Sequence, residues 1–303
     1  MDIQEIFIHE VGLRDGLQIE PEPVPTITKI QWADDMIGSN IDIIQLGSFV
    51  NPKKVFQMAD TDDLFEYYNQ PENKPAKAVL SGLVLNEKGL ERGMACGVAL
   101  FCMGVSASKT HSMKNTGMTP SEAQKTIIKM AKEAMSAGKK VQASVQSAFG
   151  CGFDGDIDEE KVYSIIKEYL NAGITTISLA DTAGYANPAK VERMFSTIQE
   201  MDNSVVTACH FHNTFGMGLA NVYAAYKTGV KIFETAFGGL GGCPFTKVAA
   251  GNVATEDIVT MFQEMGFRKD IDIKRLKGIP KYASGFLIKD LPGLSYKLDV
   301  IKH

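Results

Sequence analysis

The chain has 303 residues, with 31 Lys plus Arg against 36 Asp plus Glu and a formal net charge of −5. The chain has no long run of like charges, so its sequence does not favour a nucleic-acid or membrane-surface partner. A composition of 45 % hydrophobic and 22 % charged residues excludes a disordered chain. No apolar run approaches the about 18 residues that would predict a membrane-spanning helix.

A glycine-terminated helical pattern followed by a short apolar run recurs along the chain. Glycine just past a helix end adopts the left-handed conformation at little cost, so each such position predicts a helix stop. Helical patterns of this kind cover residues 120–137, 158–172 and 216–228. In chain order, strands are predicted to begin near Ile6, Ile41, Lys77, Val98, Lys140, Thr175, Val205 and Lys231.

Strands that alternate with helices predict βαβ units and a parallel sheet. Eight units over about 250 residues favour a closed α/β barrel, the (β/α)₈ or TIM barrel. An open doubly wound sheet is the alternative, but no Gly-x-Gly-x-x-Gly follows the first strand. We expect a TIM-barrel domain over residues 1–266 and a short C-terminal helical extension over residues 267–303, packed on the barrel.

The amino-terminal segment and the cysteines indicate a cellular compartment. Residues 1–6 are acidic and contain no apolar signal region, and the five cysteines show no Cys-x-x-Cys spacing. In a chain of this length such cysteines are typical of free thiols in a reducing environment. We therefore expect a cytoplasmic protein.

Polar residues stand at the predicted carboxyl ends of several strands, which is where barrel enzymes build their active sites. These positions supply the candidate site residues. From the first to the eighth strand they are Arg14, Asp15, Gln18, Gln45, Ser48, Ser144, Ser178, Asp181, Thr182, His210, His212, Asn213, Cys243 and Asn252.

His210 and His212 form the strongest local signal. Residues two apart in a strand point to the same face, so two imidazoles at a barrel mouth can bind one cation. A pair of hydrogen-bonded core histidines is the alternative. Asp15 is the natural carboxylate partner and Asn252 a neutral oxygen partner. Two nitrogens and two oxygens suit Mg²⁺ or Mn²⁺, with Zn²⁺ as a further candidate.

Arg14 and Cys243 have two interpretations each. Arg14 beside Asp15 would stabilise a developing oxyanion or enolate, or would form a structural ion pair. Cys243 follows four glycines, at positions 238, 239, 241 and 242, which indicates either a mobile lid that presents a thiol or a tight turn with an inert cysteine.

Taken together, these motifs resemble those of the 3-hydroxy-3-methylglutaryl-CoA (HMG-CoA) lyases, within the wider group of metal-dependent TIM-barrel lyases and Claisen synthases. The matching segments keep their order over roughly residues 5–265. They are residues 10–18, 48–53, 106–108, 149–151, 178–182, 210–216, 219–221, 238–245 and 251–258.

The resemblance implies an activity and a role for the matched residues. The activity is divalent-metal-dependent cleavage of HMG-CoA or a related 3-hydroxyacyl-CoA to acetyl-CoA and a 3-oxo acid, acetoacetate, with CoA as part of the substrate. Arg14 would stabilise the enolate and Cys243 would act in proton transfer. The implied metal ligands are Asp15, His210, His212 and Asn252. A homodimer is also implied.

The candidates divide into two further groups. As catalytic residues we group Arg14, Asp15, Gln45, Asp181, Thr182 and Cys243. As substrate-contacting residues we group Gln18, Ser48, Ser144, Ser178 and Asn213.

Several positions depart from the lyase pattern. Gln45 and Lys109 stand where these lyases usually have Glu, and Ser144 and Gln146 stand where they tend to have Tyr and Ser. The first two changes make the local charge more positive, and Ser144 would widen the pocket. We therefore expect the cleavage machinery to be retained, with either a bulkier or more acidic substrate or neutral drift in a standard lyase.

Two other functions stay open. Asn213 after His212 favours a Claisen-condensing acyltransferase of the isopropylmalate or homocitrate synthase type. Gln45 and Lys109 favour a catalytically altered, ligand-binding barrel. The glycine-rich loop 238–244 and the short chain beyond the barrel favour the lyase.

Overall fold

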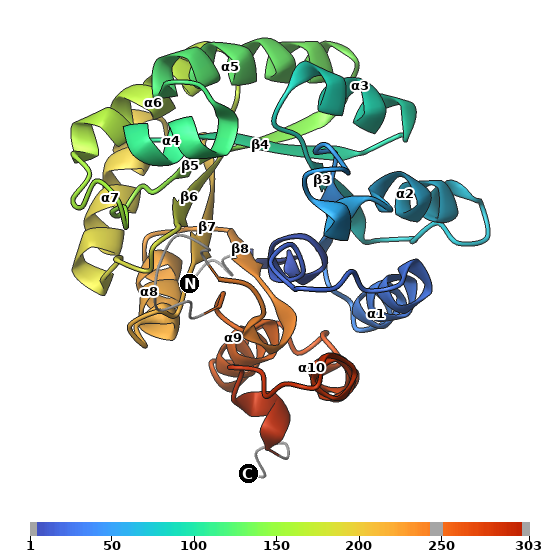
Figure 1. Cartoon of the computed structure of the whole chain (residues 1–303). Coiled ribbons are helices and arrows are strands. Elements are labelled where there is room, and N and C mark those ends of the chain that lie inside the picture. The colour runs from blue at the N-terminus through green and yellow to red at the C-terminus, as the bar shows by residue number, and fades with distance from the viewer. Residues whose placement is uncertain (1–4, 243–250, 299–303) are drawn as a thin grey trace.

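The computed structural model describes residues 5–242 and 251–298. Within them, eight parallel strands pair in chain order and close into a barrel (Figure 1). The strands are β1 (Phe7–Glu10), β2 (Ile43–Ser48), β3 (Val79–Leu83), β4 (Leu100–Ser106), β5 (Lys140–Gln146), β6 (Thr176–Asp181), β7 (Val206–Phe211) and β8 (Ile232–Thr235).

Helices surround this barrel and lie between successive strands (Figure 1). The α-helices are α1 (Thr26–Gly38), α2 (Thr61–Asn69), α3 (Glu87–Ala95), α4 (Lys109–Thr116), α5 (Pro120–Ser136), α6 (Glu159–Asn171), α7 (Pro188–Met201), α8 (Gly218–Lys227), α9 (Thr255–Glu264) and α10 (Ile273–Leu287). Short helical turns are η1 (Gly12–Gly16), η2 (Phe56–Met58), η3 (Phe237–Gly239) and η4 (Ser295–Lys297).

The predicted TIM barrel is confirmed. Each strand begins within two residues of its predicted start. The glycines that mark helix stops have the expected left-handed backbone, with φ of 74° at Gly138, 82° at Gly173 and 89° at Gly229. A side chain other than hydrogen is strained in this region, so glycine ends these three helices and turns the chain towards the next strand.

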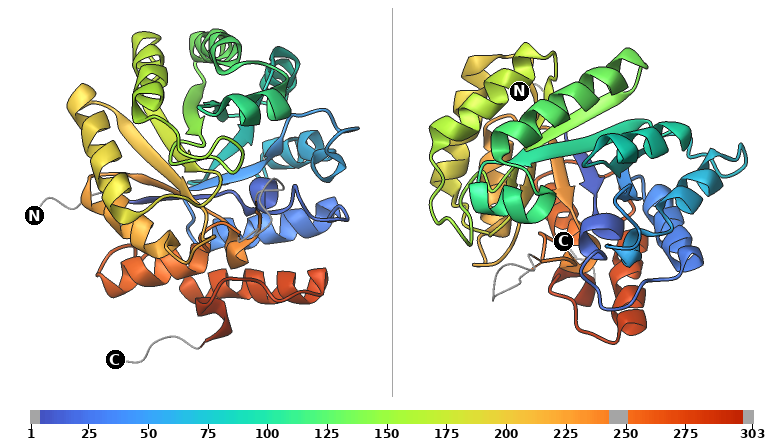
Figure 2. Two further views of the ribbon diagram at one scale, coloured as in Figure 1. Left: turned by 60° about the vertical axis from the view of Figure 1, so that its left-hand side comes forward. Right: turned by 45° about the horizontal axis from the view of Figure 1, so that its top comes forward.

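The helix that follows the barrel in the sequence packs against the first and the last helix of the barrel. α10 lies beside α1 and α9 (Figure 2). Trp32 of α1 makes edge-on ring contacts with Tyr282 and Phe286 of α10, at centroid distances of 6.4 and 5.9 Å. The division into a barrel domain and an extension at residue 266 stays a prediction.

The inside of the barrel changes from apolar to polar along its axis. Near the amino ends of the strands, Ile43, Leu100 and Ile232 form part of a small apolar cluster. Nearer the carboxyl ends, the buried side chains include Gln142 and Glu234. Polar side chains therefore lie at the carboxyl end of the barrel, where enzymes of this fold have their active sites.

None of the described helices has both the length and the apolar character needed to cross a membrane.

Candidate metal centre and active site

A one-turn π-helix after β1 carries two of the predicted site residues. Arg14 and Asp15 lie in η1, and Glu10, at the end of β1, holds this turn in place. Glu10 Oε1 accepts hydrogen bonds from the backbone N–H groups of Gly12 (2.6 Å) and Phe237 (3.1 Å). The Thr255 hydroxyl donates to Glu10 Oε2. Burial raises the pKa of Glu10 to about 7. The carboxylate thereby ties η1 to η3 and α9.

Replacing Glu10 with alanine should lower the free energy of unfolding by about 3 kcal/mol or more, because each buried donor left unpaired costs about 1–3 kcal/mol. Urea denaturation measures the difference. Glu159→Ala is the matched control, since it removes a surface ion pair with Arg193 that is worth about 1 kcal/mol or less. Equal losses in the two variants would contradict this role of Glu10.

The structure brings Asp15, His210 and His212 together at the mouth of the barrel, with all three side chains buried. The two Nε2 atoms of His210 and His212 are 3.2 Å apart, and each lies 3.8 Å from Asp15 Oδ2. The point equidistant from these three atoms lies roughly 2.1 Å from each, which is the bond length of Mg²⁺ to oxygen or Zn²⁺ to nitrogen. The three donor atoms therefore fit one divalent cation.

Asn252 lies against this triad. Its backbone pairs with His212 in a β-bridge, and its Nδ2 donates to Asp15 Oδ2 (2.8 Å) and to the Leu240 carbonyl (2.9 Å). Its Oδ1 is buried and has no hydrogen-bond partner among the described residues. A buried oxygen without a partner beside three cation-binding atoms fits the predicted fourth ligand.

Electrostatics favour a charged carboxylate in the triad. Burial alone would raise the pKa of Asp15, but the Arg14 guanidinium and the two histidines hold it well below its usual range. Burial lowers the pKa of His212, which favours the neutral imidazole that binds metals. Asp15 and His212 thus have the protonation states that a cation requires. Burial would lower the pKa of His210, but the carboxylates of Glu234 and Asp15 outweigh it and raise that pKa.

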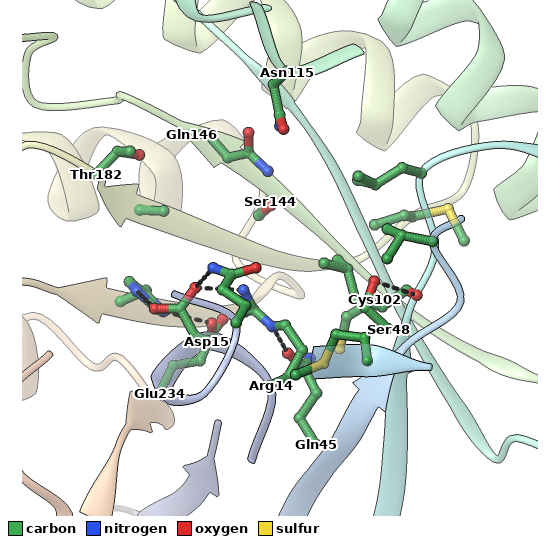
Figure 3. Close-up of a pocket in the computed structure, with 18 of the residues that line it drawn as sticks. Arg14, Asp15, Gln45, Ser48, Cys102, Asn115, Ser144, Gln146, Thr182 and Glu234 are labelled. Atoms are coloured by element: carbon green, nitrogen blue, oxygen red, sulfur yellow. Dashed lines mark hydrogen bonds and ion pairs between the residues drawn. The ribbon is translucent and has the colours of Figure 1, made fainter. Parts of the chain in front are cut away.

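A pocket of about 320 Å³ opens beside the triad (Figure 3). Arg14 lines this pocket beside Asp15, and donates to Asp15 through Nη1 and to Gln45 through Nε. The position of Arg14 is compatible with both predicted interpretations. The side chain forms an ion pair with Asp15, and it also faces the space that a substrate would fill.

Most of the predicted site residues line this pocket. Gln18 also donates to Asp15 Oδ1 (2.9 Å), so it supports the carboxylate. Cys243 lies outside the described residues. The predicted residues in the pocket wall are Arg14, Asp15, Gln18, Gln45, Ser48, Ser144, Thr182, His210 and His212.

Besides Asn252, which lies against the triad, three predicted residues do not line the pocket. The Asp181 carboxylate accepts the backbone N–H groups of Tyr185 and Ala186, and burial raises its pKa to about 7. Asn213 is exposed and accepts the N–H of Gly218 at the start of α8. Ser178 is fully buried and donates to Glu234 (2.7 Å). These side chains support the turns and the floor of the site.

The departures from the lyase pattern divide between pocket and surface. Gln45 is 1 % exposed and Ser144 and Gln146 line the pocket. Lys109 is exposed at the first turn of α4 and is not among the pocket-lining residues. The expected positive charge from Lys109 is therefore absent from the pocket wall, and only Gln45 alters the charge there.

Sequence reasoning missed Glu234. This buried residue of β8 lines the pocket, and its Oε2 lies 3.0 Å from His210 Nδ1. Burial would raise its pKa, but the hydrogen bond from His210 and the nearby histidine charge lower it to about 2. A carboxylate in the middle of an apolar strand was the available signal, because a buried charge is rarely found without a partner.

Comparison with known proteins shows the family to which the chain is related. The HMGL-like family model matches residues 5–282. The chain is 33 % identical to the hydroxymethylglutaryl-CoA lyase of Bacillus subtilis over 99 % of this chain and 98 % of that one. It is also 33 % identical to the (R)-citramalyl-CoA lyase of Chloroflexus aurantiacus, over 96 % and 94 % of the two chains.

A solved structure shows the same likeness in three dimensions. The HMG-CoA lyase of Acinetobacter baumannii, in complex with coenzyme A and 3-methylmalate, superposes with a TM-score of 0.89. The two chains are 36 % identical over 99 % of this chain and 98 % of that one. With a family match over most of its length and relatives that are lyases, the chain belongs to the HMGL-like family of lyases.

Proposed function

We propose that the protein is a divalent-metal-dependent carbon–carbon lyase that cleaves HMG-CoA to acetyl-CoA and acetoacetate. The observation that carries the proposal is the Asp15–His210–His212 triad with Arg14 beside it in one pocket. Relatives named as hydroxymethylglutaryl-CoA lyases over nearly the full chain support the choice of substrate.

The residues divide the chemistry between them. Asp15, His210, His212 and Asn252 would hold the cation, which supplies Lewis-acid polarisation of the substrate's hydroxyl oxygen. As that hydroxyl gives its proton to a basic group of the pocket wall or to solvent, the carbon–carbon bond breaks and its electron pair passes to the acetyl thioester as an enolate. Arg14 lines the same pocket, and in this proposal its guanidinium offsets the negative charge.

The enolate then takes a proton at carbon to give acetyl-CoA. We propose Cys243 for proton transfer, because it directly follows Gly242, which lines the pocket. Mg²⁺ or Mn²⁺ suits a site with two oxygen ligands, and Zn²⁺ remains a candidate. We also propose a cytoplasmic homodimer, which light scattering on the purified protein tests.

The metal-stripped protein should lose about 99 % or more of its HMG-CoA cleavage and regain it with added Mn²⁺ or Mg²⁺, because a Lewis acid contributes several kcal/mol. Acetoacetate release measures the reaction. Full activity without metal would contradict the proposal.

Citramalyl-CoA belongs in the same assay as a second substrate candidate. The side chains of Ser144 and Gln146 line the pocket, and neither makes a side-chain hydrogen bond to another described residue, which favours a polar acyl group (Figure 3). A relative is named (R)-citramalyl-CoA lyase. Faster cleavage of citramalyl-CoA would assign the protein to 2-hydroxy diacid thioesters. Thiol release from acetyl-CoA on adding 2-oxo acids would indicate the synthase instead.

A further inference from the structure

Glu234 is bound by three neighbouring strands. Its Oε1 accepts hydrogen bonds from Gln142 Nε2 of β5 (2.7 Å) and from the Ser178 hydroxyl of β6 (2.7 Å). Its Oε2 lies 3.0 Å from His210 Nδ1 of β7. Only 8 % of Glu234 is exposed, so these contacts are shielded from solvent. These contacts from β5, β6 and β7 therefore fix the orientation of the Glu234 carboxylate, which belongs to β8.

The two histidines of the triad differ in their support. An ionised carboxylate only accepts hydrogen bonds, so His210 Nδ1 carries the hydrogen in its contact with Glu234. The ring then directs Nε2 at Asp15 Oδ2 and His212 Nε2. His212 Nδ1, in contrast, is buried and has no partner among the described residues. Of the two rings, His210 is the one whose tautomer and orientation a second side chain determines.

We infer that Glu234 is a positioning residue, which sets the affinity of the site for its divalent cation by fixing the tautomer and orientation of His210. The inference relies on the metal site of the proposed function. Glu234 does not touch the position between the three donor atoms, so its effect passes through His210. Carboxylates that orient a metal-binding histidine are typically worth 10- to 100-fold in metal affinity.

Substitutions of Glu234 and of its neighbour Ser178 should weaken metal binding to different extents. Glu234→Gln keeps an oxygen that can accept from His210 Nδ1, but its amide group meets the donors Gln142 and Ser178. Ser178→Ala removes one donor to Glu234 and leaves its contact with His210 intact. Glu234→Ala removes the contact with His210 itself. The loss of metal affinity should therefore be smallest in Ser178→Ala, larger in Glu234→Gln and largest in Glu234→Ala.

The experiment is calorimetric titration of the metal-stripped full-length protein with Mn²⁺. We expect the Kd to rise about 10- to 100-fold in Glu234→Ala, less than about tenfold in Glu234→Gln and under about threefold in Ser178→Ala. Glu256→Gln is the matched control. Glu256 is a fully buried carboxylate that accepts the N–H of Gly238, and no contact joins it to the triad among the described residues. Its variant should bind Mn²⁺ within about twofold of the parent.

Activity gives a second readout that a merely structural role would not produce. At saturating Mn²⁺, kcat in Glu234→Gln should recover to near the parent value, while the Mn²⁺ concentration for half-activation stays raised. An unchanged Mn²⁺ Kd in Glu234→Ala, or an equal loss in Glu256→Gln, would overturn the inference. If circular dichroism shows that Glu234→Ala is unfolded, equal affinities in Glu234→Gln and the parent overturn it.

The two proposals fail in different ways. A parent protein that binds Mn²⁺ but cleaves no thioester would end the proposed function, and the titrations would still decide the role of Glu234.

Discussion

Alanine in place of His212 is expected to abolish metal-dependent cleavage, with a fall in kcat/KM of about 10³-fold or more. His212 Nε2 is one of the three donor atoms that surround a single point. It lies 3.2 Å from His210 Nε2 and 3.8 Å from Asp15 Oδ2. Lewis-acid stabilisation is worth several kcal/mol, and each 1.36 kcal/mol is tenfold in rate. The measurement is kcat/KM for HMG-CoA at a fixed Mn²⁺ concentration, together with the Mn²⁺ Kd.

His212 is a better target than His210 for this experiment. Its Nδ1 has no partner among the described residues, so its removal, unlike that of His210, does not take a hydrogen-bond partner from Glu234. His9→Asn is the matched control. His9 is a buried histidine of β1, its pKa is lowered to about 4 by burial, and its Nε2 contacts the Ser81 hydroxyl and not the triad. If His212→Ala bound Mn²⁺ as tightly as His9→Asn, the metal site would be elsewhere.

Replacing Arg14 should lower kcat by about 10²- to 10³-fold, the range seen when one preorganised group that stabilises a developing oxyanion is removed. Arg14 is held by Asp15 and by Gln45, whose amide orients the guanidinium without cancelling its charge. Because the enolate forms only during bond cleavage, the loss should appear in kcat more than in KM. Steady-state kinetics of Arg14→Met at saturating Mn²⁺ measures it.

Arg14→Lys separates charge from geometry. A lysine keeps the positive charge but cannot donate to Asp15 and Gln45 from a planar fork, so we expect only partial recovery of kcat. Arg193→Met is the control, since Arg193 lies on α7 in a surface ion pair with Glu159. A normal kcat in Arg14→Met would reduce Arg14 to a structural ion-pair partner of Asp15.

The barrel could be predicted because its signals are local. Glycine helix stops and apolar strand runs recur within a few residues of each other, and the steric cost of a left-handed backbone acts wherever glycine is absent. The pairing of His210 and His212 was equally local, because alternate residues of one strand share a face.

The same alternation explains why two of the predicted site residues lie outside the pocket wall. Ala180 and Thr182 line the pocket, so Asp181 between them points the other way, into the turn before α7. Asn213 likewise follows the inward-pointing His212 and supports the start of α8. Position at a strand end was not sufficient evidence, because only one of two successive side chains faces the barrel axis.

The amino-acid sequence by itself determined the eight βα units, the pair of histidines and the family resemblance, because each depends on neighbouring residues or on motifs in order. Only the tertiary structure decided which distant groups meet. Closure of the barrel places Asn252 Nδ2 at 2.8 Å from Asp15, across 237 residues of sequence, and Glu234 beneath His210. Such contacts depend on strand register and barrel closure, which bring together side chains that no local pattern relates.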